Sequence, residues 1–222
     1  MWRKNGSPEF AVIGLGRFGK AVASTLIQRG FAVLGIDRDP QIVQDMSDEI
    51  DNVVALDSTD EDALHSVDIT SFDTVVVAIG TNFESNLMTT VALKSLGVRR
   101  VVCKAFTERQ KTILLRVGAD QVVLPEHEAG ARLAYRLIEP LVREHLDLGA
   151  GFSVAELVTP KRLVGQTLAE SNLRQGHGIN VLAVKHGGTM TVNPAPEYTF
   201  GQNDVIVVIG SDQSIASFCE IR

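Results

Sequence analysis

A Gly-x-Gly-x-x-Gly motif near the start of the chain constrains its fold more than any other feature. An apolar run of strand type, residues 10–13, leads into Gly14, Gly16 and Gly19, and residues 20–30 then show helical spacing. Gly14 allows a tight turn, Gly16 lets a phosphate approach the backbone, and Gly19 lets the helix pack closely on the strand. The helix N-terminus then faces the anion with its N–H groups. This segment therefore predicts a strand, a turn and a helix that bind a nucleotide phosphate.

An acidic residue after the next apolar run strengthens this prediction. Residues 31–36 lead into Asp37, about twenty residues beyond the motif, where a carboxylate can accept hydrogen bonds from both ribose hydroxyls. Arg38 is a residue type that can bind the 2′-phosphate of NADP, but Asp37 beside it would repel that phosphate, so NADP is disfavoured. Arg17 is interpreted as a phosphate contact, because a cation beside a helix N-terminus is unfavourable unless an anion lies nearby. Together these residues predict a bound adenine nucleotide.

Composition and charge exclude several classes of protein. The chain has 222 residues, of which 45% are hydrophobic and 22% charged, which is typical of a soluble globular protein of one or two domains. Its net charge of −6 disfavours nucleic acid as a partner. Apolar runs such as residues 75–79 are far too short to span a bilayer, and the first residues lack a signal peptide, so a cytoplasmic protein is expected. Residues 1–9 are interpreted as a leader left by cloning.

Cys103 and Cys219 show no pattern of a disulfide or a metal site, and they are predicted to be buried or idle thiols.

The first two thirds of the chain repeat a strand–helix unit. Further strands are predicted at residues 53–56, 73–80, 101–104 and 121–124, and helices at residues 40–50, 60–67, 82–96 and 108–117. Near-continuous Val, Ile and Leu runs indicate strands that are buried on both faces, which is typical of a parallel sheet. Residues 10–125 are therefore predicted to form an α/β domain with a Rossmann-like, doubly wound parallel sheet, whose ligands lie at the carboxyl ends of the strands.

Polar residues and glycines gather at these predicted carboxyl ends. The predicted nucleotide-binding residues are Gly14, Leu15, Gly16, Arg17, Phe18, Asp37, Arg38, Asp57, Ser58, Thr59, Ile79, Gly80, Lys104 and Glu126. Ser58 and Thr59 serve equally well as helix caps and as ligand contacts. No catalytic residue is predicted.

Residues 126–148 are predicted to form two crossover helices with a bend at Pro140, because proline cannot donate its N–H within a helix. Leu133, Leu137 and Leu141 recur at four-residue spacing and form an apolar stripe. The stripe either packs on its own domain or is exchanged with a second subunit, and the bend favours the second subunit.

Residues 149–222 are predicted to form a second, smaller α+β domain after a Gly149-Ala150-Gly151 linker. Strands are predicted at residues 152–159, 181–185, 189–192 and 204–210, and short helices at residues 163–171 and 214–221. Gly187-Gly188 joins the second and third of these strands as a hairpin. The domain is too small, and too poor in convergent titratable groups, to be the catalytic half of a dehydrogenase.

The motifs of both domains resemble the RCK (regulator of potassium conductance) family, of the TrkA type. The segments that resemble the N-terminal RCK domain are residues 12–19, Asp37, residues 78–80, Lys104, residues 118–120 and residues 125–126. Those that resemble the C-terminal RCK domain are residues 163–168, 173–174, 178–185 and 201–204. One domain of each kind without a membrane span is the layout of the cytosolic regulatory subunits of Ktr potassium uptake systems.

The resemblance implies a regulatory role without enzymatic activity. It implies dimers that form an octameric ring, docked at the inner face of the membrane on a potassium channel subunit of the KtrB or TrkH kind, with ATP and ADP exchange switching the gate. In the family the residue matching Arg17 reaches the terminal phosphates of ATP across the dimer, and the one matching Asp37 holds ribose. The residue matching Glu126 lies where Mg²⁺ or Ca²⁺ can bridge the ATP phosphates.

Some members of the family bind cyclic di-AMP in the C-domain dimer. The residues of this chain that match that site are Leu173, Arg174, Ile179, Asn180 and Pro194.

Two other classes remain open from the residues alone: a small NAD-dependent oxidoreductase and an NAD(H)-sensing regulator. NAD and ATP share the adenosine half that Asp37 reads, so the sequence leaves the choice between ATP/ADP and NAD(H) open. The oxidoreductase lacks an identifiable proton donor and substrate pocket, and a transcriptional regulator lacks a helix-turn-helix region.

Overall fold

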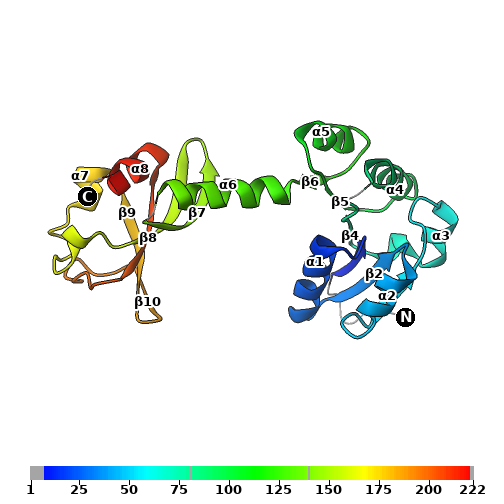
Figure 1. Ribbon diagram of the computed structural model, residues 1–222, viewed down its shortest axis with the longest axis horizontal. Coiled ribbons are helices and arrows are strands. Elements are labelled where there is room, and N and C mark those ends of the chain that lie inside the picture. Colours follow the sequence, from blue (N-terminus) through cyan, green and yellow to red (C-terminus); the bar gives the residue numbers. More distant parts are fainter. Residues whose placement is uncertain (1–7, 81, 140, 221–222) are drawn as a thin grey trace. The chain divides into compact units, whose positions relative to one another are not determined.

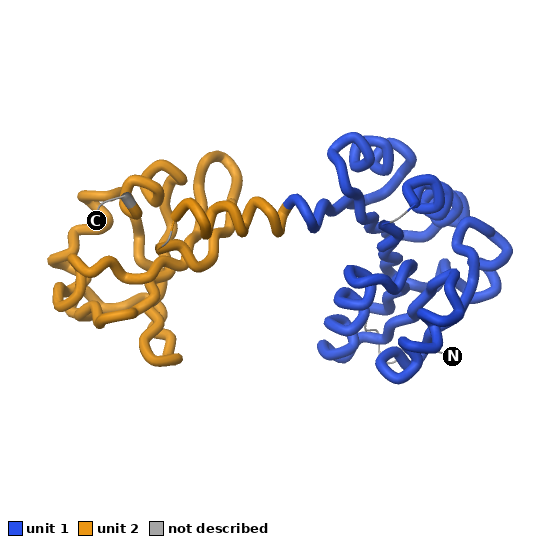
Figure 2. Tube along the Cα trace, viewed as in Figure 1, with its two compact units in different colours: residues 1–127 blue, residues 128–222 orange. Residues whose placement is uncertain are grey.

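The computed structural model describes residues 8–80, 82–139 and 141–220, and it divides into two compact units (Figures 1 and 2). Unit 1 is Met1–His127 and unit 2 is Glu128–Arg222, and each is described by itself. Most of the predicted leader, residues 1–7, lies outside the described residues, whereas Glu9 already belongs to the first strand.

Unit 1 is built on a parallel sheet of six strands. They are β1 Glu9–Ile13, β2 Ala32–Asp37, β3 Asn52–Ala55, β4 Thr74–Val77, β5 Val101–Lys104 and β6 Gln121–Val123. Their order is β3-β2-β1-β4-β5-β6, and every neighbouring pair is parallel. The order reverses between β1 and β4, which is where ligands lie in a doubly wound sheet. The predicted Rossmann-like fold is confirmed.

Helices connect these strands and cover the sheet of unit 1 (Figure 1). They are α1 Arg17–Gln28, α2 Pro40–Met46, α3 Glu61–Ser66, the short 3-10 helix η1 Ile69–Ser71, α4 Phe83–Ser95 and α5 Glu108–Arg116. Asp39 caps α2 by accepting a hydrogen bond from the Gln41 N–H, and Pro40 takes the first helical position. The cap of α3 is Asp60, so of the two alternatives for Ser58 and Thr59, the one in which they cap this helix is wrong.

Both faces of the parallel sheet are buried. Ile13 and Val77 belong to one apolar cluster, while their neighbours Val12 and Val76 belong to another. This alternation follows from the strand geometry, in which successive side chains point to opposite faces. It explains why the strands are apolar along their whole length instead of alternating with polar residues.

The segment after Pro125 differs from its prediction. Helix α6 spans Pro125–Ile138, and strand β7, Val142–Gly149, follows in place of a second helix; Pro140 lies outside the described residues. Strand β7 pairs along its length with β8, Phe152–Val158, in an antiparallel ladder. The four-residue spacing that ended at Leu141 predicted a helix, but pairing with β8 overrides this local preference.

The predicted linker Gly149-Ala150-Gly151 is instead the turn of the β7–β8 hairpin. Its three residues have positive φ values of 81°, 56° and 78°. Glycine adopts this region at little cost, which suits a tight reversal of the chain.

Unit 2 contains an antiparallel sheet of five strands with order β10-β9-β11-β8-β7. Its remaining elements are the 3-10 helix η2 Lys161–Leu163, α7 Leu173–His177, β9 Asn180–His186, β10 Thr189–Val192, β11 Val205–Ser211 and α8 Asp212–Glu220. The predicted hairpin, now β9 and β10, is confirmed. The core brings Leu157 and Ile206 of the sheet together with Ile215 and Phe218 of α8.

The predicted helix over residues 163–171 is wrong. Only Leu163 belongs to a helical turn, and Thr167 forms an isolated bridge with Thr199. The Glu170 carboxylate accepts hydrogen bonds from both the N–H and the hydroxyl of Thr167. Such local bonds between side chain and backbone compete with helix formation.

Among the described residues, no helix is long and apolar enough to cross a membrane.

Candidate nucleotide-binding site

The glycine motif forms the turn between β1 and α1, and its three glycines have different roles. Gly14 has a φ of +92°, and a Cβ there would lie 3.1 Å from backbone atoms of Ala78 and Ile79. A Cβ at Gly19 would lie 1.8 Å from the Gly14 carbonyl oxygen, so only glycine fits. A Cβ at Gly16 would meet nothing within 4 Å. Gly14 and Gly19 are therefore needed by the fold, while Gly16 faces open space at the start of α1 that a phosphate can enter.

Asp37 joins the carboxyl ends of β1 and β2. Its Oδ2 accepts a hydrogen bond from the Leu15 N–H at 2.7 Å, and its Oδ1 accepts one from the Asp39 N–H at 3.0 Å. A carboxylate has about four acceptor sites, so both oxygens keep the capacity to accept a ribose hydroxyl. Asp37 thus fixes the glycine turn and remains suited to the sugar.

A cavity opens beside Asp37, at the carboxyl ends of β2 and β3. Its volume is about 570 Å³, within the range of about 300–1,000 Å³ that is usual for small-molecule sites. The residues that line it are Arg38, Asp39, Pro40, Ala55, Leu56 and Asp57. The hydrogen bond from the Thr59 backbone N–H lowers the pKa of Asp57. The cavity suits the adenosine half of a nucleotide.

Lys104 and Glu126 meet at the other end of the carboxyl edge. Lys104 Nζ lies 2.6 Å from Glu126 Oε1, and the Lys104 side chain is 8% exposed while that of Glu126 is 55% exposed. The hydrogen bond from Lys104 lowers the pKa of Glu126, and the charges of Lys104 and Arg17 lower it further. Lys104 and Glu126 therefore form an ion pair at this edge, and the lysine is a cation that suits phosphate groups.

Two aromatic rings border this ion pair. Lys104 Nζ lies 4.5 Å from the ring centroid of Phe106 and 5.5 Å from that of Phe18. Both distances allow a cation–π interaction. Gly80 completes the cluster, because a Cβ there would lie 3.1 Å from Phe106 Cζ and 3.6 Å from Lys104 Nζ.

The predicted residues Ser58 and Thr59 have other partners. The Ser58 hydroxyl is buried and lies 2.8 Å from the hydroxyl of Thr89 in α4. The Thr59 hydroxyl donates to Asp57 at 2.7 Å. Of the two, Ser58 connects the loop after β3 to α4, and Thr59 orients Asp57.

Phe106 and Asn86 belong to this edge but were not predicted from the sequence. Phe106 lies two residues after Lys104, the last residue of β5, and this short spacing could have indicated that Phe106 belongs to the same strand end. Asn86 lies one turn inside α4, where its burial has no signal in the sequence. Its amide Nδ2 contacts the backbone carbonyls of Ile79 and Lys104.

The acidic residues do not form a metal site by themselves. Within residues 8–80, 82–139 and 141–220, no group of three or more His, Cys, Asp or Glu side chains is placed to hold a metal ion. Glu126 can therefore contribute one carboxylate to a divalent cation only if phosphate oxygens supply further ligands.

Cys103 and Cys219 are free thiols, buried and half-buried respectively, as predicted. Burial raises the pKa of each to about 11, so neither is a reactive thiolate at neutral pH.

The two units define a class of protein: a Rossmann-type domain with a site suited to a nucleotide, followed by a small domain with an antiparallel sheet. The TrkA-N domain family matches residues 10–125, and the TrkA-C domain family matches residues 154–222. The chain belongs to this TrkA family, the RCK type that its motifs resemble.

Similar proteins support the same assignment along nearly the whole chain. Ktr system potassium uptake protein C of Bacillus subtilis (strain 168) is 37% identical over 210 residues, which cover 95% of each chain. Ktr system potassium uptake protein A of Vibrio alginolyticus is 32% identical and covers 96% of this chain and 97% of that protein. The solved NAD(P)-binding domain of an exopolyphosphatase-related protein from Archaeoglobus fulgidus is 25% identical with a TM-score of 0.53, and covers 60% of this chain and 98% of that domain.

Proposed function

We propose that this protein is the cytosolic regulatory subunit of a membrane potassium uptake channel and that ATP and ADP control it by binding to unit 1. The observation that carries the proposal is the position of Asp37 at the carboxyl end of β2 and of Lys104 at the carboxyl end of β5, on either side of β1 and its glycine turn. The potassium uptake proteins at 37% and 32% identity support the role in transport. The protein acts by binding, without catalysis.

The nucleotide lies along the carboxyl edge of the parallel sheet. Adenine enters the cavity beside Arg38 and Asp57, ribose binds Asp37, and the first phosphates approach the Gly16 backbone. Lys104 lies on the phosphate side, next to Gly80 and Phe106. Arg17 reaches the terminal phosphates of a nucleotide in the neighbouring subunit of a dimer. The predicted residues Gly14, Leu15, Phe18, Ser58, Thr59 and Ile79 shape this surface or contact the ligand.

Glu126 would contribute a carboxylate ligand to a divalent cation, Mg²⁺ or Ca²⁺, that accompanies ATP. Such a cation would neutralise the repulsion between the carboxylate and the phosphates. This suits the single exposed carboxylate, which is held close to the phosphate side by Lys104.

Dimers of the protein assemble into an octameric ring on the cytoplasmic side of a channel subunit of the KtrB or TrkH kind. Glu126 lies in the first turn of α6, the helix that leads from unit 1 into unit 2. A change at the phosphates can therefore act on α6 through Lys104 and Glu126. Cyclic di-AMP is a proposed second effector in unit 2, near Leu173, Arg174, Ile179, Asn180 and Pro194.

The second candidate function is NAD(H) sensing. The Archaeoglobus fulgidus domain at 25% identity is named as NAD(P)-binding, and this favours NAD as an alternative ligand. NAD would use the same contacts for its adenosine half.

Mass spectrometry of the nucleotide that copurifies with the protein tests the proposal, together with thermal-shift titration. Ligands that bind the native state raise the melting temperature in proportion to the logarithm of their concentration. We expect stabilisation by ATP and ADP at micromolar concentrations, whereas stabilisation by NADH alone would replace the proposal with NAD(H) sensing.

A further inference from the structure

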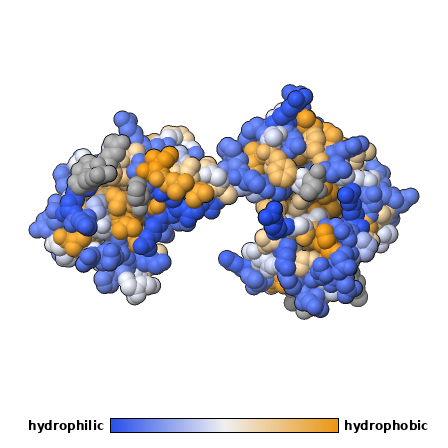
Figure 3. All heavy atoms as spheres, in the orientation of Figure 1, coloured by the Kyte–Doolittle hydropathy of each residue, from blue (hydrophilic) through white to orange (hydrophobic). Residues whose placement is uncertain are grey.

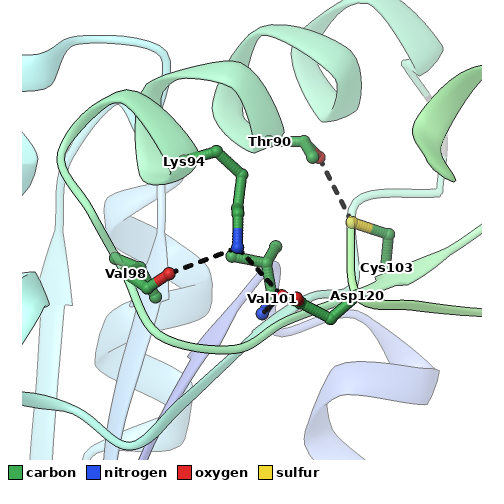
Figure 4. A network of polar contacts seen from close by, with 6 residues as sticks. All are labelled: Thr90, Lys94, Val98, Val101, Cys103 and Asp120. Atoms are coloured by element: carbon green, nitrogen blue, oxygen red, sulfur yellow. Dashed lines mark hydrogen bonds and ion pairs between the residues drawn. The ribbon is translucent and has the colours of Figure 1, made fainter. Parts of the chain in front are cut away.

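One face of helix α4 is tied to strand β5 along its length. Thr90 and Lys94, one turn apart, both point toward β5 and the turn before it (Figure 4). Thr90 Oγ1 lies 3.2 Å from Cys103 Sγ. Lys94 Nζ donates to Asp120 Oδ2 at 3.1 Å, and the same Oδ2 accepts the Val101 N–H at 2.7 Å. Helix α4 is therefore a fixed support for the start and the middle of β5.

Asn86 continues this row of contacts at the carboxyl end of β5. It lies four residues before Thr90, the spacing that places two side chains on one helix face. The side chain is 2% exposed, and its Nδ2 donates at 2.8 Å to the Ile79 carbonyl and at 2.9 Å to the Lys104 carbonyl. A side-chain amide has two N–H donors, so each carbonyl receives one of them.

These two carbonyls lie at the ends of neighbouring strands. The last residues paired in the register of β4 and β5 are Val77 and Cys103. Ile79 and Lys104 come after that pair, and Lys104, the last residue of β5, is paired only with Val123 of β6. The Asn86 amide thus bridges the two strand ends at the point where their own pairing stops.

The two hydrogen bonds that the Asn86 side-chain amide donates determine how this side chain is oriented. Its buried Oδ1 has no hydrogen-bond partner among the described atoms, although burying an unpaired acceptor is unfavourable. An apolar side chain would avoid that cost but would give up both bonds to the strand ends. The two carbonyl contacts are therefore the interaction that this asparagine supplies.

We propose that Asn86 is a positioning residue for the phosphate side of the nucleotide site, an inference that rests on the proposed function. It fixes the backbone from which the Lys104 side chain extends and the backbone that leads into Gly80. Both groups meet at Phe106, on the phosphate side. The ribose side is formed by Asp37 and Leu15, which are joined by their own hydrogen bond.

The test compares two ligands, because a positioning role on one side of the site changes their relative affinity. ATP uses both sides of the site, while adenosine uses only the ribose side. In Asn86→Leu we expect ATP affinity to fall about tenfold, the size expected when one charged contact is misplaced, and adenosine affinity to stay within about twofold of the wild type. Isothermal titration measures both constants.

Thr90→Val is the matched control on the same helix face. It removes the hydroxyl that donates to the Asn86 backbone carbonyl and contacts Cys103, and it leaves the two strand-end carbonyls bound to the Asn86 side chain. It is expected to lower the melting temperature while keeping the ratio of ATP to adenosine affinity unchanged. A merely structural role for Asn86 would give the same result in Asn86→Leu, and that would overturn the inference.

Asn86→Ser covers the case in which Asn86→Leu does not fold. A serine hydroxyl can donate to only one of the two carbonyls. We expect an intermediate loss of ATP affinity, about threefold, again with adenosine spared. If a folded Asn86→Ser protein keeps the wild-type ratio of ATP to adenosine affinity, the inference about Asn86 is overturned and the proposed function is not. If the wild-type protein binds no ATP, the proposed function and the inference both fall.

Discussion

Lys104, whose side chain is buried at 8% exposure, donates a hydrogen bond to Glu126, whose side chain is 55% exposed to solvent. A pair so open to water on one side contributes little to stability, since solvent screens it. The exposed Glu126 carboxylate is accessible to a cation, and in the proposed site phosphates would compete with it for Lys104. The ion pair thus links the carboxyl end of β5 to the first turn of α6.

The first prediction concerns Glu126→Gln with and without divalent cations. Without a cation the carboxylate repels the phosphates of ATP, so its loss should leave ATP affinity unchanged or increase it. With Mg²⁺ or Ca²⁺ present, the loss removes a ligand of the bridging ion and should weaken ATP binding. Isothermal titration in chelator and in each metal measures the sign change. If the substitution changes ATP affinity equally with and without metal, Glu126 does not bind the cation and its role is the ion pair with Lys104.

Asp37→Ala should weaken all adenosine ligands to a similar extent. The ribose contact is common to ATP, ADP and NAD, and a lost hydrogen bond to a charged group costs about 1.5–3 kcal/mol, or roughly one to two decades in affinity. The substitution also removes the acceptor of the Leu15 N–H, so the glycine turn is less constrained. Titration of the three ligands against the same protein checks this, and an unchanged ADP affinity would contradict the ribose assignment.

The fold of unit 1 was predictable because local and global signals agree there. Near-continuous apolar strands, a capped α2 and a glycine turn all indicate the same sheet, and the strand order then places Asp37 beside Leu15. A fold can be predicted from sequence when the local pattern and the global fold agree in this way. The residues at the carboxyl edge of the sheet were predicted from where each strand ends.

Residues 141–149 and 163–171 were not predictable by the same means, although the strand between them was. Leu133, Leu137 and Leu141 have helical spacing, but only the first two lie in α6, and the chain then enters β7. The pairing of β7 with β8 is a tertiary interaction, and the local sequence does not contain it. The Asn86 contacts are similar: they depend on where β4 and β5 end relative to α4, which a pattern of residues does not specify.

Two glycines of the motif should respond oppositely to alanine. Gly16→Ala places a methyl group in open space, so the melting temperature should change little while nucleotide affinity falls, because the methyl group blocks the phosphate. Gly19→Ala places a Cβ 1.8 Å from the Gly14 carbonyl oxygen, and it should destabilise the fold strongly. Thermal melts with and without ADP separate the two effects. Loss of stability in Gly16→Ala would show that this residue too is needed by the fold.

Arg17→Ala should harm ATP binding much more than ADP binding. Arg17 is exposed at the first position of α1, so removing it leaves the core intact. In the proposed dimer it meets the terminal phosphate of ATP, and ADP lacks that group. The ratio of the two dissociation constants is the quantity to measure. Equal losses for the two nucleotides would place Arg17 at the inner phosphates.

Helix α6 carries apolar side chains that the single chain does not bury. The side chains of Leu133, Leu137 and Ile138 are 51%, 73% and 72% exposed, and no residue of α6 is buried. Apolar atoms gather on the visible surface of unit 2 in the region where α6 lies (Figures 1 and 3). In the proposed assembly a second subunit covers this face, and each buried leucine would contribute about 1.5–3 kcal/mol to association.

The double variant Leu133→Asp/Leu137→Asp tests this interface without disturbing the fold of one chain, because both side chains are already exposed. Two carboxylates in an apolar contact are costly, so light scattering should show a shift from oligomer to monomer. The matched control is Arg132→Asp, which introduces a carboxylate about 100° from Leu133 and about 140° from Leu137 around the same helix, outside the leucine face. It should remain oligomeric. If the double variant also keeps the mass of the wild-type oligomer and its response to ATP, α6 is not the contact that couples the subunits.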